Sequence, residues 1–242
     1  MVIDWATTAV YNTIMAVSVG IGLLLIVRFF SHLHASKIGH LEGWAIGFAI
    51  PGLILTITGF HMSLTWPLSK MGFPFDDIIF GESSIAFGVL LLGITVLLWR
   101  KANLYLKQGI DTNNSTVVSE NLKKELPYLL KPLSYFGAAM GFALIAMGCA
   151  GVTFHLFAAP PQEPISGLFA DYPMIEATFM SLLLALTGVG AILFAVNQKE
   201  NPSPSLVKFN QWAWTITGII WTAFGIMNYF THIGLIIHTL GH

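Results

Sequence analysis

Six apolar segments constrain the fold of this chain more than any other feature of its sequence. A helix needs about 20 mostly apolar residues to cross roughly 30 Å of hydrocarbon. Hydrophobic residues make up 55% of the chain and charged residues only 10%, whereas a soluble domain carries about 25% charged residues. The sequence therefore predicts an all-α integral membrane protein with the lipid bilayer as its partner. The six expected spans are Trp5–Phe30, Gly43–Thr65, Ile78–Trp99, Leu133–Phe157, Pro173–Val196 and Phe209–Ile233.

The second and third spans recur as the fourth and fifth. Residues 43–98 align with residues 137–192 without a gap, and 13 of the 56 aligned positions are identical. His61 recurs as His155 and Glu82 as Glu176, so a histidine and a glutamate keep the same separation inside apolar surroundings. Direct repeats of this kind usually sit around an axis along the membrane normal. We therefore predict a tandem repeat of two-helix hairpins that forms a pseudo-twofold four-helix bundle.

The whole chain, residues 1–242, is expected to form one transmembrane domain. It would consist of a first repeat at about 43–98, a cytoplasmic link at about 101–130, a second repeat at about 137–192, and flanking helices at about 5–30 and 209–233. The link is the only long polar stretch. Within it, Ser119 to Leu126 fits either a short interfacial helix or a solvated tether between the repeats.

The lysines and arginines predict how the chain is oriented. Ten of the 11 lie on one side of the predicted topology, and only Lys70 lies on the other. Cytoplasmic loops carry an excess of Lys and Arg, so we expect a multi-pass protein of the cell membrane with both termini extracytoplasmic. The net charge of −1 leaves no basic face to neutralise phosphates, which argues against nucleic acid as a partner.

Five ionisable residues are expected at the same outer level of the membrane. They are His61, Glu82, His155, Glu176 and His232. Each repeated histidine lies near the outer end of its span, and each repeated glutamate stands in the first turns of the returning helix. Ionisable groups within a membrane normally face the protein interior and pair or bind something. We therefore expect the four repeat residues to converge on the axis, with His232 of the sixth span as a fifth ligand.

Three interpretations of this cluster stay open. In the first, the imidazoles and carboxylates bind one or two metal ions, since Glu and His on facing helices build such sites in four-helix bundles and mixed nitrogen and oxygen ligands suit Cu, Fe, Zn or Mn. In the second, His61 and His155 are the axial ligands of haem b, and the glutamates form a proton or quinol site. In the third, each histidine pairs with a glutamate to fix its hairpin, and nothing is bound.

The metal interpretation predicts a redox or metal-handling membrane protein with its centre near the extracytoplasmic face. Such a protein would act alone, as a homo-oligomer, or with subunits of a respiratory or other membrane complex. The alternatives are a protein that reacts with haem b or quinol, and a non-catalytic subunit of a larger membrane complex. The sequence contains no phosphate-binding loop, nucleophile elbow or HExxH motif, so it assigns no reaction.

Two short runs in the first repeat carry a resemblance to a known family. The run Phe60–Leu68, followed by Ile79–Ser84, is similar to the signature of a prokaryotic family of uncharacterised multi-span integral membrane proteins, a domain of unknown function. The resemblance implies a multi-span helical fold and no activity. Trp66 and Glu82 match the pattern, whereas the second repeat has Pro160 in the place of Trp66.

Overall fold

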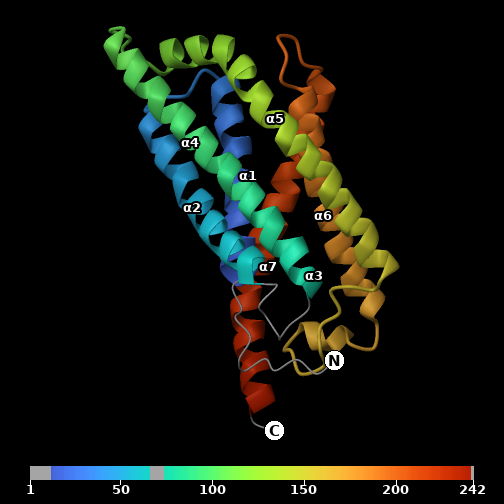
Figure 1. The fold of residues 1–242 in the computed structure, drawn as a ribbon. Coiled ribbons are helices and arrows are strands. Elements are labelled where there is room, and N and C mark those ends of the chain that lie inside the picture. The colour runs from blue at the N-terminus through green and yellow to red at the C-terminus, as the bar shows by residue number, and fades with distance from the viewer. Residues whose placement is uncertain (1–11, 66–73, 241–242) are drawn as a thin grey trace.

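The structure, a computed structural model, describes residues 12–65 and 74–240, and its long elements there are all helices. Six of them are long and apolar enough to cross a membrane (Figure 1). The predicted all-α fold with six spans is therefore confirmed. The elements are α1 (Asn12–His34), α2 (Leu41–Thr65), α3 (Pro74–Asp76), the π-helix η2 (Asp77–Glu82) that leads directly into α4 (Ser83–Lys107), α5 (Ser115–Thr153), the 3₁₀ turn η3 (Ser166–Phe169), α6 (Pro173–Val196) and α7 (Pro204–Leu240).

The predicted span limits match best for α6, whose two ends are as expected. Trp5, the expected start of the first span, lies outside the described residues, as do Trp66 and Lys70. The largest difference concerns α5, which has 39 residues and already begins at Ser115. It also ends at Thr153, so His155 lies in the following loop rather than on a helix.

The first part of α5 lies across one end of the bundle before the helix turns down alongside α6 (Figure 1). Pro127 and Pro132 stand inside α5, and a proline in a helix interior removes a backbone hydrogen bond and bends the helix. The side chains of Val118, Leu122 and Leu126 are buried. This part of the chain is thus a helix rather than a solvated tether, and its apolar face packs against the protein.

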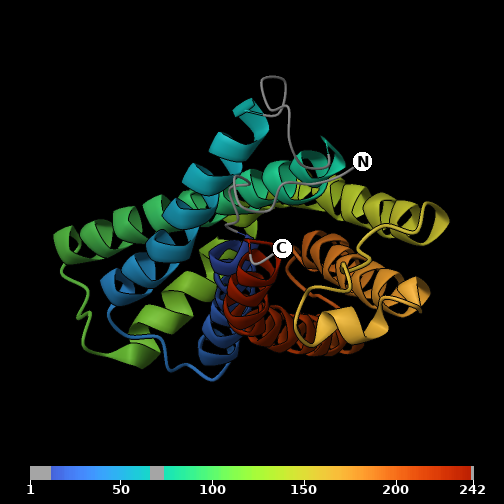
Figure 2. The same ribbon diagram turned by 90° about the horizontal axis from the view of Figure 1, so that it is seen from below.

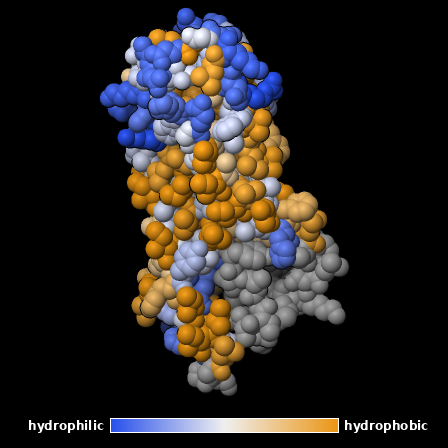
Figure 3. Space-filling view, turned by 90° about the vertical axis from the view of Figure 1, so that its left-hand side faces the viewer, coloured by the Kyte–Doolittle hydropathy of each residue, from blue (hydrophilic) through white to orange (hydrophobic). Residues whose placement is uncertain are grey.

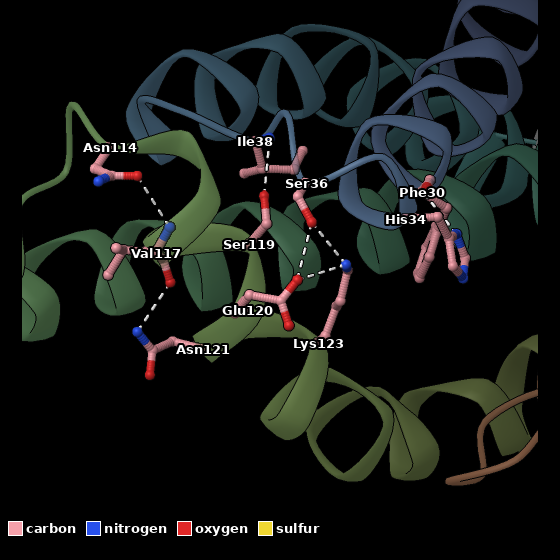
Figure 4. A network of polar contacts seen from close by, with 10 residues as sticks. All are labelled: Phe30, His34, Ser36, Ile38, Asn114, Val117, Ser119, Glu120, Asn121 and Lys123. Atoms are coloured by element: carbon pink, nitrogen blue, oxygen red, sulfur yellow. Dashed lines mark hydrogen bonds and ion pairs between the residues drawn. The ribbon is translucent and has the colours of Figure 1, made fainter.

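Polar contacts attach this part of α5 to the connection between α1 and α2 (Figure 4). The backbone N–H of Ile38 donates a hydrogen bond to Ser119 Oγ at 3.0 Å. Ser36 Oγ donates to Glu120 Oε1 at 2.9 Å, and Lys123 Nζ donates to the same carboxylate at 2.8 Å. These hydrogen bonds fix the predicted link to the connection between α1 and α2.

The helices pack most closely as three pairs, α1–α7, α2–α4 and α5–α6. Helix α1 also contacts α2, and α7 also contacts α6, so the α1–α7 pair lies between the two hairpins (Figure 2). The four repeat helices therefore do not form a core by themselves, in contrast to the central bundle expected from the sequence. The tandem repeat itself stays a prediction.

Glycines allow close approach within each hairpin. A Cβ atom at Gly88 of α4 would lie 2.6 Å from the backbone nitrogen of Thr56 in α2. A Cβ atom at Gly141 of α5 would lie 2.6 Å from the carbonyl oxygen of Gly188 in α6. Membrane helices use such small residues to bring their backbones into contact.

The outer surface divides into a polar cap and an apolar belt (Figure 3). Large apolar side chains such as Ile50, Leu53 and Ile57 of α2 are exposed along the helices, as expected for a surface that contacts lipid. We call the capped end, with the end of α4 and the first part of α5, the basic end. The opposite end, which carries the loop of residues 154–172, is the loop end.

Candidate functional site

A cavity of about 520 Å³ lies inside the bundle between α1, α4, α5, α6 and α7. Its walls along the helices are mainly apolar, with Leu91, Met140, Leu144 and Met180 among them. Toward the loop end the lining becomes polar, and we call this part of the cavity the polar end. The polar end is lined by Asn12, Asp76, His155, Glu163, Ser166, Glu176, Asn228 and His232.

Three of the five predicted site residues line the polar end together. His155 follows α5, Glu176 stands in the first turn of α6, and His232 lies on α7. They come from three different elements, and these elements meet because α7 packs on α6 and α6 on α5. The structure thus brings His155, Glu176 and His232 to one cavity.

His61 and Glu82 do not line this cavity, in contrast to the expected convergence of all four repeat residues. His61 is exposed near the end of α2, a helix from which none of the described lining residues comes. Glu82 is exposed at the end of η2, whereas its neighbours Ser83 and Ser84 line the cavity. A π-helical turn closes i→i+5 bonds and so rotates the residues relative to an α-helix. Glu82 and Glu176 align in the predicted repeat, but their side chains therefore do not point in equivalent directions.

Glu163 is a polar-end residue that the sequence analysis did not identify. Its side chain is 9% exposed, and its Oε1 atom lies 3.6 Å from Nε2 of His232, which is beyond the length of a hydrogen bond. Burial raises the pKa of the Glu163 carboxyl, because desolvation disfavours the charged form. The sequence feature that could have identified Glu163 is its place as an acidic residue between Pro161 and Pro164 in a mainly apolar loop.

The loop of residues 154–172 is fixed to the helices around the polar end. The backbone N–H of Ala159 donates a hydrogen bond to Glu176 Oε2 at 2.7 Å. The Nδ1–H of His238 on α7 donates to the carbonyl oxygen of Gln162 at 2.8 Å. His155 and Phe157 have positive φ angles of 53° and 70°, a conformation that non-glycine residues keep only where their surroundings impose it.

Asp76 contributes a third carboxyl group to the polar end. Burial, together with the neighbouring charge of Asp77, raises the pKa of Asp76 to about 7. Asp76, Glu163 and Glu176 thus place three acidic side chains around one end of an otherwise apolar cavity. The described lining contains no Lys or Arg to compensate for them.

These side chains do not form a recognisable metal site in the part of the chain that the structure describes. Among residues 12–65 and 74–240, no group of three or more His, Cys, Asp or Glu side chains is arranged to hold an ion. What the arrangement offers is a set of hydrogen-bonding groups at the end of a long apolar space.

The fold and this cavity define the class of the protein. The chain has six helices long and apolar enough to span a membrane, and five of them enclose a cavity that is apolar along the helices and polar at one end, so the chain is a multi-pass membrane protein. Residues 8–234 match the family described as a protein of unknown function, DUF981, and the chain belongs to this family. The predicted membership of a multi-span family of unknown function is confirmed. No match is found among curated proteins or among solved structures.

Proposed function

We propose that this protein binds an amphiphilic small molecule within the membrane. The observation that carries the proposal is the cavity of about 520 Å³ between five helices. Its volume falls within the roughly 300–1,000 Å³ of ligand-binding pockets. The apolar tail of the ligand would lie between the helices, and its head group would lie at the polar end.

The two parts of the cavity suit the two parts of an amphiphile. Phe87 and Leu91 of α4 face the cavity together with Met140 of α5 and Met180 of α6. Such side chains favour an alkyl or isoprenoid chain, and methionine adapts to irregular shapes. At the other end, Glu163, Glu176 and His232 would meet a head group that forms hydrogen bonds. A quinol, one of the alternatives that the sequence predicts, has this build.

The predicted metal centre has less support from this geometry. His155, Glu176 and His232 line one cavity with Glu163, but the described residues contain no group of three arranged to hold an ion. The predicted haem b has less support as well, because His155 lines the cavity and His61 does not. Redox or metal-handling activity stays a prediction that elemental analysis and an absorption spectrum would test.

We also propose that the basic end faces the cytoplasm of the cell and that both termini lie outside. The distribution of Lys and Arg supports this orientation. In a Cys149→Ala background, a cysteine at Leu168 should react with a membrane-impermeant maleimide on intact cells, and a cysteine at Asn113 should not. The reverse labelling pattern would overturn the orientation.

Quenching of tryptophan fluorescence tests the proposed function. Trp214 and Trp221 line the cavity. In a variant that keeps these two tryptophans and has Phe at the others, the fluorescence therefore comes from the cavity and responds to a ligand bound there. We expect 11-bromoundecan-1-ol to quench this fluorescence saturably in a detergent without hydroxyl groups, such as lauryldimethylamine oxide. A quench that rises linearly with the probe would show partition into the micelle alone and would contradict the proposal.

A matched pair of glycine variants controls this experiment. Gly137 lines the cavity, and a Cβ atom there would approach Leu90 only to 3.8 Å. The leucine of Gly137→Leu therefore fits the backbone and fills part of the cavity, so we expect the probe to bind at least about tenfold more weakly. A Cβ atom at Gly43, which aligns with Gly137 in the predicted repeat, has no neighbour within 4 Å. Gly43→Leu should leave binding unchanged.

A further inference from the structure

The charges at the polar end restrict the class of head group that it can accept, an inference that rests on the proposed function. Asp76, Glu163 and Glu176 line this end, and the lining that the structure describes includes no Lys or Arg. Phosphate groups in proteins are bound by cationic side chains or by donors that face the anion. The described lining offers a phosphate no cationic side chain, so it does not favour an anionic lipid head group.

The polar end instead presents hydrogen-bond acceptors. Nδ1 of His232 is buried and has no hydrogen-bond partner among the described residues. Nε2 of the same ring lies 3.6 Å from Glu163 Oε1, and a neutral imidazole has one nitrogen that accepts a hydrogen bond. The Glu176 carboxyl uses one oxygen for the N–H of Ala159 and has a second oxygen for another donor. An acceptor left unpaired in a buried place is unfavourable, so a ligand that donates a hydrogen bond here is stabilised.

A cationic head group is the competing possibility, because carboxylates attract cations. Burial raises the pKa of both Glu163 and Asp76, which reduces the negative charge available to balance a cation. A cation would also have to leave water for the interior of a membrane protein, where an unpaired charge is strongly unfavourable. The surroundings therefore favour a neutral donor over a charged one.

We propose that the polar end recognises the hydroxyl group of a neutral amphiphile, which donates a hydrogen bond to the imidazole of His232, with Glu176 as the neighbouring acceptor. A quinol and a long-chain or isoprenoid alcohol share this chemistry. His232 is a binding residue in this proposal, and no chemical step is assigned to it.

Competition against the brominated probe tests this inference. The competitors are 1-dodecanol, dodecyl methyl ether, dodecyl phosphate and dodecylamine, each expressed as its mole fraction in the detergent. We expect dodecanol to displace the probe at a concentration at least about tenfold lower than the ether, because the ether cannot donate the hydrogen bond. Decylhydroquinone serves as a second hydroxyl donor. If it displaces the probe at a lower concentration than dodecanol does, the hydroxyl group is that of a quinol; if dodecanol is the better competitor, it is that of an alcohol.

Variants of His232 show whether this residue recognises the hydroxyl group by accepting its hydrogen bond. In His232→Phe the preference for dodecanol over the ether should fall below about threefold. His232→Gln keeps a side-chain acceptor and should restore part of the preference, which a purely structural role would not explain. His34→Phe, an exposed histidine at the basic end, serves as the control and should keep the full preference.

The outcomes separate the two proposals. If the probe quenches saturably but dodecanol and its ether compete equally, the inference is wrong and the binding function stands. The same holds if the phosphate or the amine competes best. Absence of saturable quenching in the protein that keeps only Trp214 and Trp221 would contradict the binding function itself.

Discussion

Asp76 illustrates at the scale of one residue how the interior alters proton affinity. Its pKa rises from 3.8 to about 7 because burial disfavours the charged carboxylate and Asp77 adds a negative charge nearby. Between these two values the folded protein retains a proton that the unfolded chain has lost. The stability contribution of this group therefore falls as the pH rises from about 4 to about 7.

Asp76→Asn should remove this pH dependence, since the amide does not ionise. We expect the variant to be more stable than the wild type by on the order of 1–4 kcal/mol at pH 7.5 and by much less at pH 4. Thermal unfolding of the detergent-solubilised protein at a series of pH values measures the difference. Asp171→Asn, an exposed position in the loop before α6, is the control. Equal stability gains for Asp76→Asn at both pH values would contradict the assignment.

The comparison of Glu82 with Glu176 shows what residue-level reasoning can and cannot predict. The depth of both glutamates follows from their place at the start of a span, and Glu176 does line the cavity. The orientation of Glu82 depends on η2, a π-helix that no apolar periodicity reveals. Glu163 stayed unpredicted because its position depends on how an irregular loop folds over the bundle.

At the scale of elements, the first part of α5 joins the two halves of the chain at the basic end. Leu122 is fully buried, and Ser119, Glu120 and Lys123 of the same segment bond to the connection between α1 and α2. Its apolar spacing was visible in the sequence, but its packing partner was not. The partner lies more than 80 residues away along the chain.

Leu122→Ala should destabilise this junction. Truncating a buried leucine removes apolar contacts and leaves a cavity, which costs about 2–5 kcal/mol. Val117→Ala removes a partly exposed side chain on the same helix and should cost less than about 1 kcal/mol. Urea or thermal unfolding compares the two variants. Equal losses would mean that this part of α5 is not packed as described.

At the scale of the whole molecule, hydropathy was sufficient to predict six helices but not their arrangement. The length and composition of the apolar segments determine how many helices cross the membrane. The prediction of a bundle made of the repeat helices did not include the pairing of α1 with α7, which lie between the two hairpins. The cavity arises from this arrangement, so it could not be predicted from the repeat alone.

The most direct test of ligand binding is native mass spectrometry of the intact protein after purification in a mild detergent. We expect a second mass peak that exceeds the protein mass by that of one neutral amphiphile, and we expect Gly137→Leu to lose it while Gly43→Leu retains it. A mass increase equal to one or two metal ions would instead favour the metal centre predicted from the sequence. A wild-type protein that carries no adduct, or an adduct that survives equally in Gly137→Leu, would contradict binding of an amphiphile in the cavity.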